Sequence, residues 1–271
     1  MGERHKGFDV GRRDAPHRIL WIHGYTGSPD AFVHTAERLS RELDAHVLAP
    51  LLPGHGTVET KLLRHSFNEF YRSAHYFAKT LCHKNKPFAY LGYSFGGYIA
   101  ALLAAEFKPS ALSLALTPYS LRFPFWLPGV ATLLSMRSFW DKYLTLEDIH
   151  VRRGTFYYPR LPGRSLSLIH EGNFRLRKIL PSITCPILTM HNAGDPLAAP
   201  ESGLTITEEN KNPNNEAHVF TGGRHALFFR PEREVEEQVL IAFLKKHFEK
   251  KVPPGVNPGG ESVSGLRTAD H

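Results

Sequence analysis

The sequence predicts an α/β protein in which a mostly parallel sheet has helices on both faces and carries an inserted cap. Short apolar runs alternate along the chain with stretches of helical spacing, which is typical of parallel strands buried on both faces. A glycine-rich turn around Ser94 joins one apolar run directly to a stretch of strong helix formers. One long segment, from about residue 118 to 180, interrupts the alternation.

Composition is that of a soluble globular protein. Of its residues, 42% are hydrophobic and 22% are charged, and its length of 271 residues suffices for one large α/β domain or for two small ones. The net charge is +7, but the basic residues are scattered in pairs such as Arg12-Arg13. We interpret this charge as a solvated surface that mildly favours anionic partners, and we expect no nucleic-acid binding.

The cysteines and histidines do not have the spacing of a metal or redox site. Cys82 and Cys185 are far apart, and no two of the sixteen histidines are closer than six residues. We therefore expect no metal and no cofactor. No apolar leader follows the first residues and no run approaches the length of a membrane span, so we expect a cytoplasmic protein without stable membrane insertion.

Six apolar runs are interpreted as strands separated by helical stretches. They are Arg18–Ile22, His46–Pro50, Pro87–Leu91, Ala111–Leu116, Pro186–His191 and Glu216–Phe220. The polar residues 1–17 are expected to form a partly ordered lead to a domain at 18–250, and the Pro- and Gly-rich residues 251–271 to form a flexible tail.

Helix starts are marked by residues that cap helices. Ser28 and Pro29 supply an N-cap and a first-turn proline after the first strand. Ser66 and Glu69 have the spacing of a capping box. Pro231 is expected to open the last helix, which runs to about residue 250.

The segment at about 118–180 is predicted to be a cap. It is apolar and irregular, with several prolines, and it is longer than a loop inside a compact domain usually is. Its aromatic side chains are candidates for binding substrate. They are Phe123, Phe125, Trp126, Phe139 and Trp140.

The turn at Ser94 has the pattern G-x-S-x-G, with Gly92 and Gly96 on either side of the serine. A Cβ at either glycine is expected to collide with the neighbouring strand or helix, while Ser94 holds a strained backbone with its hydroxyl exposed. The letters alone also fit a glycine-rich turn with an ordinary surface serine. The strand before the motif and the helix after it favour a nucleophile elbow.

Acyl transfer needs a base that takes the proton of the nucleophile and an acid that orients the base. Asp195 follows the strand that ends at His191, and His225 follows the last strand. Because an open α/β sheet collects its site at the carboxyl ends of its strands, both are candidates to join Ser94.

Other residues compete for these roles. Asp30 and Asp44 lie in the wrong half of the chain for the acid, and Glu201 lies several residues past the strand end. Asp195 with Pro196 could instead form a simple turn. His225 could be a surface-loop histidine, and the remaining candidate base, His247, lies on a helix with lysines.

Four motifs in this order resemble the α/β-hydrolase family, and within it the serine esterase and monoacylglycerol-lipase-like group. They are His23-Gly24, Pro53-Gly54-His55-Gly56, the Ser94 turn, and Asp195 with His225. The resemblance covers about residues 18–250, and the cap matches only in position and character. The chain departs from longer members of the family in beginning at their third strand.

The resemblance implies an α/β-hydrolase fold and an oxyanion hole made by the backbone N–H groups of Tyr25 and Phe95. The chemistry agrees, since the residue after a nucleophile offers its N–H at the helix start and a second donor must come from a facing loop. Because the base role falls to His225, we interpret His23 as a histidine that fixes its loop and His55 as a turn residue.

The resemblance and the Ser94–His225–Asp195 set together predict a serine carboxylic-ester hydrolase that works through an acyl-enzyme. The expected substrate is a small-molecule ester with an apolar acyl or alkyl part, as for a carboxylesterase or a monoacylglycerol lipase. A carbon–carbon bond hydrolase or a thioesterase on the same residues is an alternative, as is a small-molecule receptor with vestigial hydrolysis. Epoxide hydrolase and dehalogenase chemistry would need a carboxylate in place of Ser94 and is excluded.

Overall fold

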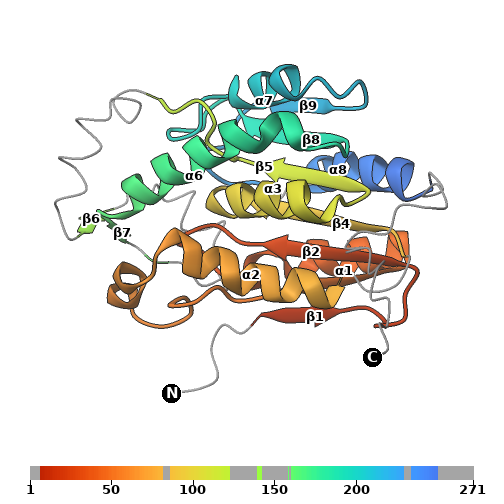
Figure 1. Ribbon diagram of the computed structural model, residues 1–271, viewed down its shortest axis with the longest axis horizontal. Coiled ribbons are helices and arrows are strands. Elements are labelled where there is room, and N and C mark those ends of the chain that lie inside the picture. Colours follow the sequence, from red (N-terminus) through yellow and green to blue (C-terminus); the bar gives the residue numbers. More distant parts are fainter. Residues whose placement is uncertain are drawn as a thin grey trace, which may run out of the picture.

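The structure is a computed structural model, which describes residues 7–81, 86–122, 139–141, 158, 160–228 and 233–249. Within these ranges one sheet contains seven strands in the order β1-β3-β2-β4-β5-β8-β9 (Figure 1). The strands are β1 Phe8–Val10, β2 His17–Ile22, β3 Ala45–Ala49, β4 Phe88–Tyr93, β5 Ala111–Ala115, β8 Ile187–Asn192 and β9 Glu216–Phe220. All neighbouring pairs are parallel except β1 with β3, which confirms the mostly parallel sheet.

Helices cover both faces of this sheet (Figure 1). One face carries α2 Phe67–Leu81, α3 Phe95–Phe107 and α6 Ser165–Ile179, and the other carries α1 Val33–Leu43 and α8 Arg233–Phe248. α7, Ser202–Asn210, links β8 to β9. Three short 3-10 helices, η1 Pro29–Phe32, η2 Glu59–Arg64 and η3 Leu180–Ser182, lie in connections.

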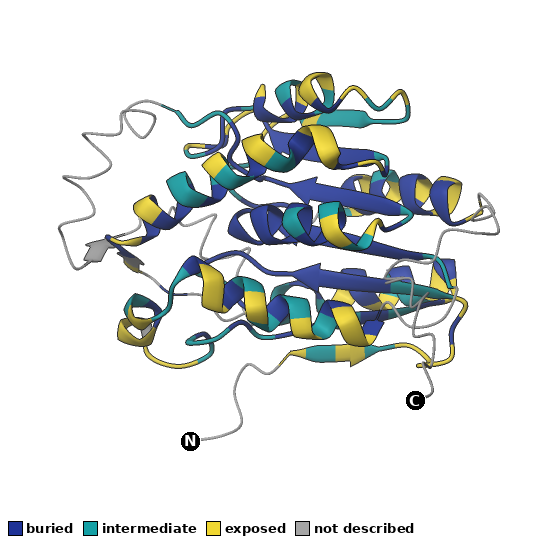
Figure 2. Cartoon of the chain, viewed as in Figure 1, coloured by how far each residue is buried: buried dark blue, intermediate teal, exposed yellow. Residues whose placement is uncertain are grey.

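The strands are apolar on both sides because each side is covered. Along β2, Leu20 and Ile22 belong to the core under α2 and α3, whereas Ile19 and Trp21 belong to the core under α1 and α8. None of the four is more than 1% exposed. Burying one such side chain contributes roughly 1.5–3 kcal/mol to folding stability. The two cores therefore hold the central strands from both faces, and Figure 2 shows these strands as buried.

The sheet contains a strand that sequence analysis did not expect. Residues 1–17 were expected to be a polar, partly ordered lead, but Phe8–Val10 forms β1, antiparallel to β3 with Phe8 opposite Ala49. Arg18–Ile22 remains the first buried strand, but a further strand precedes it at the sheet edge, which the sequence did not predict. His46 Nε2 lies 2.5 Å from Asp9 Oδ1, so this edge strand carries a polar contact of the kind that suits a sheet edge.

The segment assigned to a cap contains a regular helix. α6 lies within residues 118–180, yet it packs on the sheet beside α3, with Gly172 against the ring of Tyr98. A Cβ at Gly172 would lie 2.7 Å from Tyr98 Cγ, so the close approach requires glycine. The expectation of an irregular segment is wrong for α6.

The remainder of the predicted cap is described only in part. β6 Phe139–Asp141 and β7 Arg160–Pro162 form a separate antiparallel pair. The aromatic residues Phe123, Phe125 and Trp126 lie outside the described residues, as do the side chains of Phe139 and Trp140. Their contact with substrate and the domain boundaries remain predictions.

Two of the predicted helix starts are described. Ser66 and Glu69 form the capping box, with Ser66 N–H donating to Glu69 Oε2 at 2.7 Å and Glu69 N–H to Ser66 Oγ at 3.3 Å. Ser28 stands at the N-cap of η1, before Pro29, but its hydroxyl makes no capping hydrogen bond. None of the described helices combines the length and the apolar character that crossing a bilayer needs.

Candidate active site

Ser94 lies in the sharp turn between β4 and α3. Its backbone has φ 52° and ψ −120°, a conformation that costs a residue with a side chain about 1–3 kcal/mol. The Ser94 N–H donates to the carbonyl of Ala115 on β5 at 2.7 Å, which ties the turn to the neighbouring strand. The residue is 9% exposed. The strained conformation expected of a nucleophile elbow is present.

The two flanking glycines allow the turn to close. A Cβ at Gly92 would lie 2.7 Å from the Gly96 carbonyl oxygen, at the start of α3. A Cβ at Gly96 would lie 2.6 Å from the His23 carbonyl oxygen, beyond the end of β2. Real Cβ atoms do not tolerate such approaches, so the predicted collisions with helix and strand are confirmed.

The structure brings Ser94, His225 and Asp195 together in one chain of hydrogen bonds. The Ser94 Oγ and the His225 Nε2 are 2.7 Å apart, and the His225 Nδ1 is 2.6 Å from Asp195 Oδ2. An ionised carboxylate only accepts, so Nδ1 carries the proton and Nε2 presents its lone pair to the serine hydroxyl. This tautomer is the one in which an imidazole takes a proton from a serine.

Asp195 is fully buried and fixed by its own loop. Its Oδ1 accepts hydrogen bonds from the N–H groups of Leu197, at 2.8 Å, and Ala198, at 3.0 Å. Burial acts to raise the pKa of this carboxyl, but the His225 charge, the His225 hydrogen bond and the two backbone hydrogen bonds outweigh it and lower the pKa. The carboxylate therefore stays ionised beside the imidazole.

The rival residues are placed elsewhere. Asp44 caps the end of α1 and pairs with Arg12, 3.3 Å away. Glu201 directly precedes α7, and the His247 ring packs against Phe243 in α8 with ring centroids 4.6 Å apart.

The two residues predicted to supply the oxyanion donors contact each other through their side chains. The rings of Tyr25 and Phe95 make an edge contact, with centroids 5.4 Å apart. Phe95 is the first residue of α3, where backbone N–H groups have no partner within the helix. Within the described part of the chain, neither the Tyr25 nor the Phe95 N–H donates a hydrogen bond. Both residues therefore stay candidates for the oxyanion donors.

His23 holds the loop that carries Tyr25. The Leu52 N–H donates to His23 Nε2 at 3.0 Å, so the ring proton is on Nδ1, which donates to the Gly24 carbonyl at 2.8 Å. That carbonyl and the Tyr25 N–H belong to the same peptide group, so the imidazole fixes the plane of the predicted donor. Burial, aided by the nearby His55, lowers the pKa of His23 well below its ordinary value despite the Gly24 hydrogen bond.

His55 holds the next peptide of the same loop. Its Nε2 donates to the Tyr25 carbonyl at 2.5 Å, and its Nδ1 lies 3.0 Å from the Pro53 carbonyl. Burial lowers the pKa of this imidazole to about 4, although the backbone hydrogen bonds oppose the shift. His55, which the sequence predicted to be a turn residue, thus also holds the loop that carries Tyr25.

Sequence analysis did not single out two side chains that contact the His225 segment, Tyr93 and Asn192. Tyr93 ends β4, directly before the nucleophile, and Asn192 ends β8. Both stand at the carboxyl ends of strands, the position that drew attention to Asp195. Their place at the ends of strands is therefore the sequence signal that could have identified Tyr93 and Asn192.

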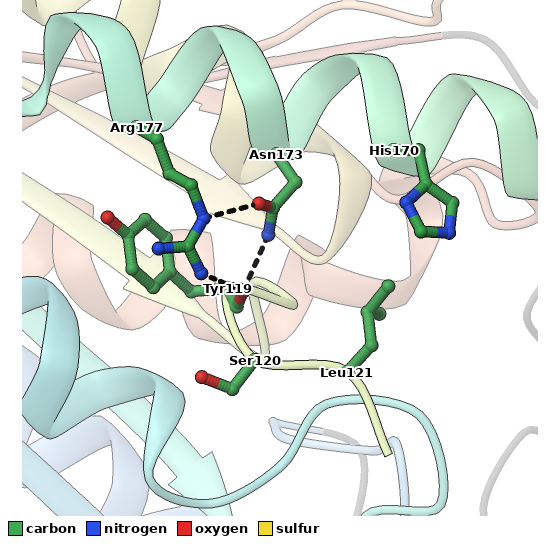
Figure 3. Close-up of a pocket in the computed structure, with 6 residues that line it drawn as sticks. All are labelled: Tyr119, Ser120, Leu121, His170, Asn173 and Arg177. Atoms are coloured by element: carbon green, nitrogen blue, oxygen red, sulfur yellow. Dashed lines mark hydrogen bonds between the residues drawn. The ribbon is translucent and has the colours of Figure 1, made fainter. Parts of the chain in front are cut away.

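A pocket of about 320 Å³ lies between α6 and the segment after β5 (Figure 3). It is lined by Tyr119, Ser120, Leu121, His170, Asn173 and Arg177. Asn173 Nδ2 donates to the Tyr119 carbonyl at 2.6 Å, and Arg177 donates to the same carbonyl at 2.9 Å. The Arg177 guanidinium also lies over the Tyr119 ring, 3.9 Å from its centroid, so these polar groups serve to hold the loop.

Comparison with known proteins gives a family and a fold. The model of the alpha/beta hydrolase family matches residues 19–238. Monoacylglycerol lipase ABHD6 of Bos taurus is 31% identical over 99 residues, which are 36% of this chain and 29% of that relative. The match therefore spans less than a third of the curated relative's length.

Solved structures resemble this one over almost the whole fold. One, from a study of the metagenome-derived lipolytic enzymes LipS and LipT, has a TM-score of 0.75 at 18% identity, covering 89% of this chain and 98% of its own. The monoacylglycerol lipase of Paleococcus ferrophilus has a TM-score of 0.74 at 18% identity, covering 91% and 100%. The family match includes Ser94, Asp195 and His225 and the sheet from Ile19 of β2 onward. The chain belongs to the alpha/beta hydrolase family.

Proposed function

We propose that this protein is a serine carboxylic-ester hydrolase that works through an acyl-enzyme. The observation that carries the proposal is the chain of short hydrogen bonds from Ser94 Oγ through the His225 ring to Asp195. The N–H groups of Tyr25 and Phe95, which donate no hydrogen bond within the described residues, support it, because an ester carbonyl becomes an oxyanion when the serine attacks.

Each residue has a role in the proposed reaction. His225 Nε2 takes the Ser94 proton as Oγ attacks the carbonyl carbon, and the Tyr25 and Phe95 N–H groups bind the oxyanion. When the ester C–O bond breaks, His225 gives the proton to the leaving alcohol. The same imidazole then takes a proton from water, which attacks the acyl carbon. As the bond from that carbon to Ser94 Oγ breaks, His225 returns the proton to Oγ and the acid is released. Asp195 keeps the ring in the correct tautomer and stabilises its cation.

The proposed substrates are esters with an apolar acyl or alkyl part, including monoacylglycerols. Two similar proteins are named monoacylglycerol lipases, and the sequence between 118 and 180 is rich in aromatic side chains. We propose that Trp126 and Trp140 contribute to the acyl site. Replacing either by alanine should then lower kcat/KM for long acyl chains more than for acetate.

The decisive experiment measures hydrolysis of p-nitrophenyl esters of graded chain length by wild type and Ser94→Ala. The variant should fold normally and lose essentially all turnover, because the glycines and not the hydroxyl allow the turn. A fluorophosphonate should label Ser94 in the wild type, as read by mass spectrometry. Near wild-type turnover by Ser94→Ala would remove this serine from the mechanism.

Adding thioesters with the same acyl groups to this panel, together with a ligand-binding assay, tests the thioesterase and receptor alternatives. Thioesters turned over faster than matched oxygen esters would identify a thioesterase. Ligand binding without turnover of any ester, in a chain that fluorophosphonate does not label, would identify a receptor.

A further inference from the structure

The backbone of the segment that carries His225 is held by two side chains from neighbouring strands. Asn192 Nδ2 donates to the carbonyl of Arg224 at 2.8 Å and to that of Ala226 at 2.9 Å. The hydroxyl of Tyr93 donates to the carbonyl of His225 itself at 3.2 Å. Three consecutive carbonyl groups therefore accept hydrogen bonds from side chains outside the segment.

Both side chains are well placed to act as fixed supports. Asn192 is fully buried, and its two amide protons are directed to two carbonyls, which an aspartate in its place could not bind. Tyr93 is 6% exposed, and its hydroxyl also accepts the Leu227 N–H at 3.3 Å. Because each group both reaches the segment and is enclosed by the core, neither has freedom to swing away.

The two supports connect the three residues of the proposed mechanism. Tyr93 is covalently joined to Ser94. Asn192 is the last residue of β8, directly before the turn that leads to Asp195, whose N–H donates to the Asn192 carbonyl at 3.2 Å. The ends of β4 and β8, which lead to Ser94 and Asp195, thus also hold the backbone of the His225 segment through hydrogen bonds.

The His225 segment needs such supports because it lies outside the helices and strands and follows two glycines, whose backbone is conformationally free. Gly222 and Gly223 precede it with φ of 79° and 71°, values that glycine adopts easily. Its imidazole must nevertheless meet a serine and a carboxylate at 2.7 and 2.6 Å at the same time. A displacement of about 1 Å at a reacting group can cost roughly 100-fold in rate.

We propose that Tyr93 and Asn192 are positioning residues, which set the backbone of His225 so that its ring bridges Ser94 and Asp195. The proposal rests on the proposed function, in which His225 is the base. Neither side chain touches the substrate; both act through the imidazole.

Tyr93→Phe is the cleanest test, because it removes one hydroxyl and keeps the ring. We expect kcat on p-nitrophenyl butyrate to fall about 10-fold with KM nearly unchanged, since alignment and not binding is lost. The matched control is Tyr98→Phe, which removes a buried hydroxyl that donates to the Pro118 carbonyl at 2.5 Å. The control should keep kcat within twofold.

Asn192→Leu removes both amide donors, keeps the branched shape and the number of side-chain heavy atoms, and should lower kcat about 100-fold. Asn210→Leu is its control, because Asn210 Nδ2 also donates to two buried carbonyls, those of Leu180 and Ile183, at 2.8 Å each. Both variants should lose similar thermal stability, but only Asn192→Leu should lose activity well below its Tm. If Asn192→Leu does not fold, Tyr93→Phe alone decides the matter.

The His225→Ala background separates positioning from a general structural role. A residue that acts through the imidazole has nothing left to position there, so adding Tyr93→Phe should not change the residual turnover. A further loss of turnover would mean that the hydroxyl supports Ser94 or the oxyanion site instead. The rate of fluorophosphonate labelling of Ser94 should fall with kcat in the single variants.

Wild-type kcat in folded Tyr93→Phe and Asn192→Leu would overturn the proposal, as would equal losses in the Tyr98 and Asn210 controls. These outcomes differ from failure of the proposed function. In that case Ser94→Ala would keep its activity, whereas failure of the positioning role alone leaves Ser94→Ala inactive.

Discussion

Two loops face the Ser94 hydroxyl, and they are held in chemically different ways. The loop with Tyr25 is held by the imidazoles of His23 and His55, both buried and with pKa lowered by that burial. The loop with His225 is held by an amide and a phenol, two groups that take up no proton in mildly acidic water. One support responds to acid and the other does not.

The two supports differ in whether they take up protons, and each kind suits the loop that it holds. The proposed base must itself take and release protons, so a non-titrating support keeps its position constant through that cycle. The proposed oxyanion donors are backbone N–H groups that carry no proton equilibrium of their own. Their loop can be held by histidines as long as these stay neutral, which burial ensures near neutral pH.

The largest effect is expected when the His225 ring loses the orientation that Asp195 gives it. Asp195→Asn should keep the fold, because both side chains have the same shape, while kcat drops by up to about 10⁴ as the imidazole takes the wrong tautomer. Steady-state kinetics on a p-nitrophenyl ester measures the loss. If Glu201→Gln proved the damaging change and Asp195→Asn were mild, the acid would be misassigned.

A smaller effect is expected when the Tyr25 side loses its donor. Tyr25→Pro removes the backbone N–H and should lower kcat about 10²–10³-fold, whereas Tyr25→Phe keeps the N–H and most of the rate. Circular dichroism must show that the proline variant is folded. A folded proline variant with normal kcat would place the second oxyanion donor elsewhere. A large kcat loss in Tyr25→Phe would instead give the phenol a part in the transition state.

The third effect is on stability rather than on rate, and it tests directly the support made by the histidines. The folded-state pKa of His55, about 4, lies below the ordinary value near 6.5, so the unfolded chain binds the proton more readily. Stability is therefore complete above about pH 6.5 and falls as pH drops toward 4, by about 3 kcal/mol from this residue. His23 and His191, whose pKa values burial also lowers, act in the same direction.

Urea unfolding at pH 7.5, 5.5 and 4.5 measures this loss of stability. His55→Gln should be less stable than wild type at pH 7.5 but should lose less stability on acidification. His34→Gln, an exposed change on α1, is the control and should follow the wild type. Parallel curves for wild type and His55→Gln would show that His55 does not couple the loop to pH.

Much of the fold followed from local signals in the sequence. The apolar runs predicted the central strands because both faces of these strands are buried, and the G-x-S-x-G pattern predicted the turn because its glycines meet other backbone atoms. The proximity of Ser94, Asp195 and His225 followed from their positions after strands. Their catalytic roles, and those of Tyr25 and Phe95, remain proposals that the experiments above test.

The features that sequence analysis missed depend on contacts made at long range or on weak local patterns. β1 has three residues, too few for a hydrophobic period to stand out in a polar stretch. In α6, Leu166, Ile169 and Leu176 have helical spacing, but the prolines and aromatic residues before them favoured a cap. The supports of His225 involve partners more than thirty residues from Asn192 and more than a hundred from Tyr93.

The backbone of Ser94 has a consequence for how selection acts on this chain. Glycine at this position would relieve about 1–3 kcal/mol of strain while losing about 0.5–1 kcal/mol to the greater freedom of the unfolded chain. By this arithmetic a lineage that used the fold only to hold a ligand would gain stability by exchanging the serine for glycine. In the proposed mechanism, the serine at φ 52° therefore lowers folding stability in exchange for a nucleophile.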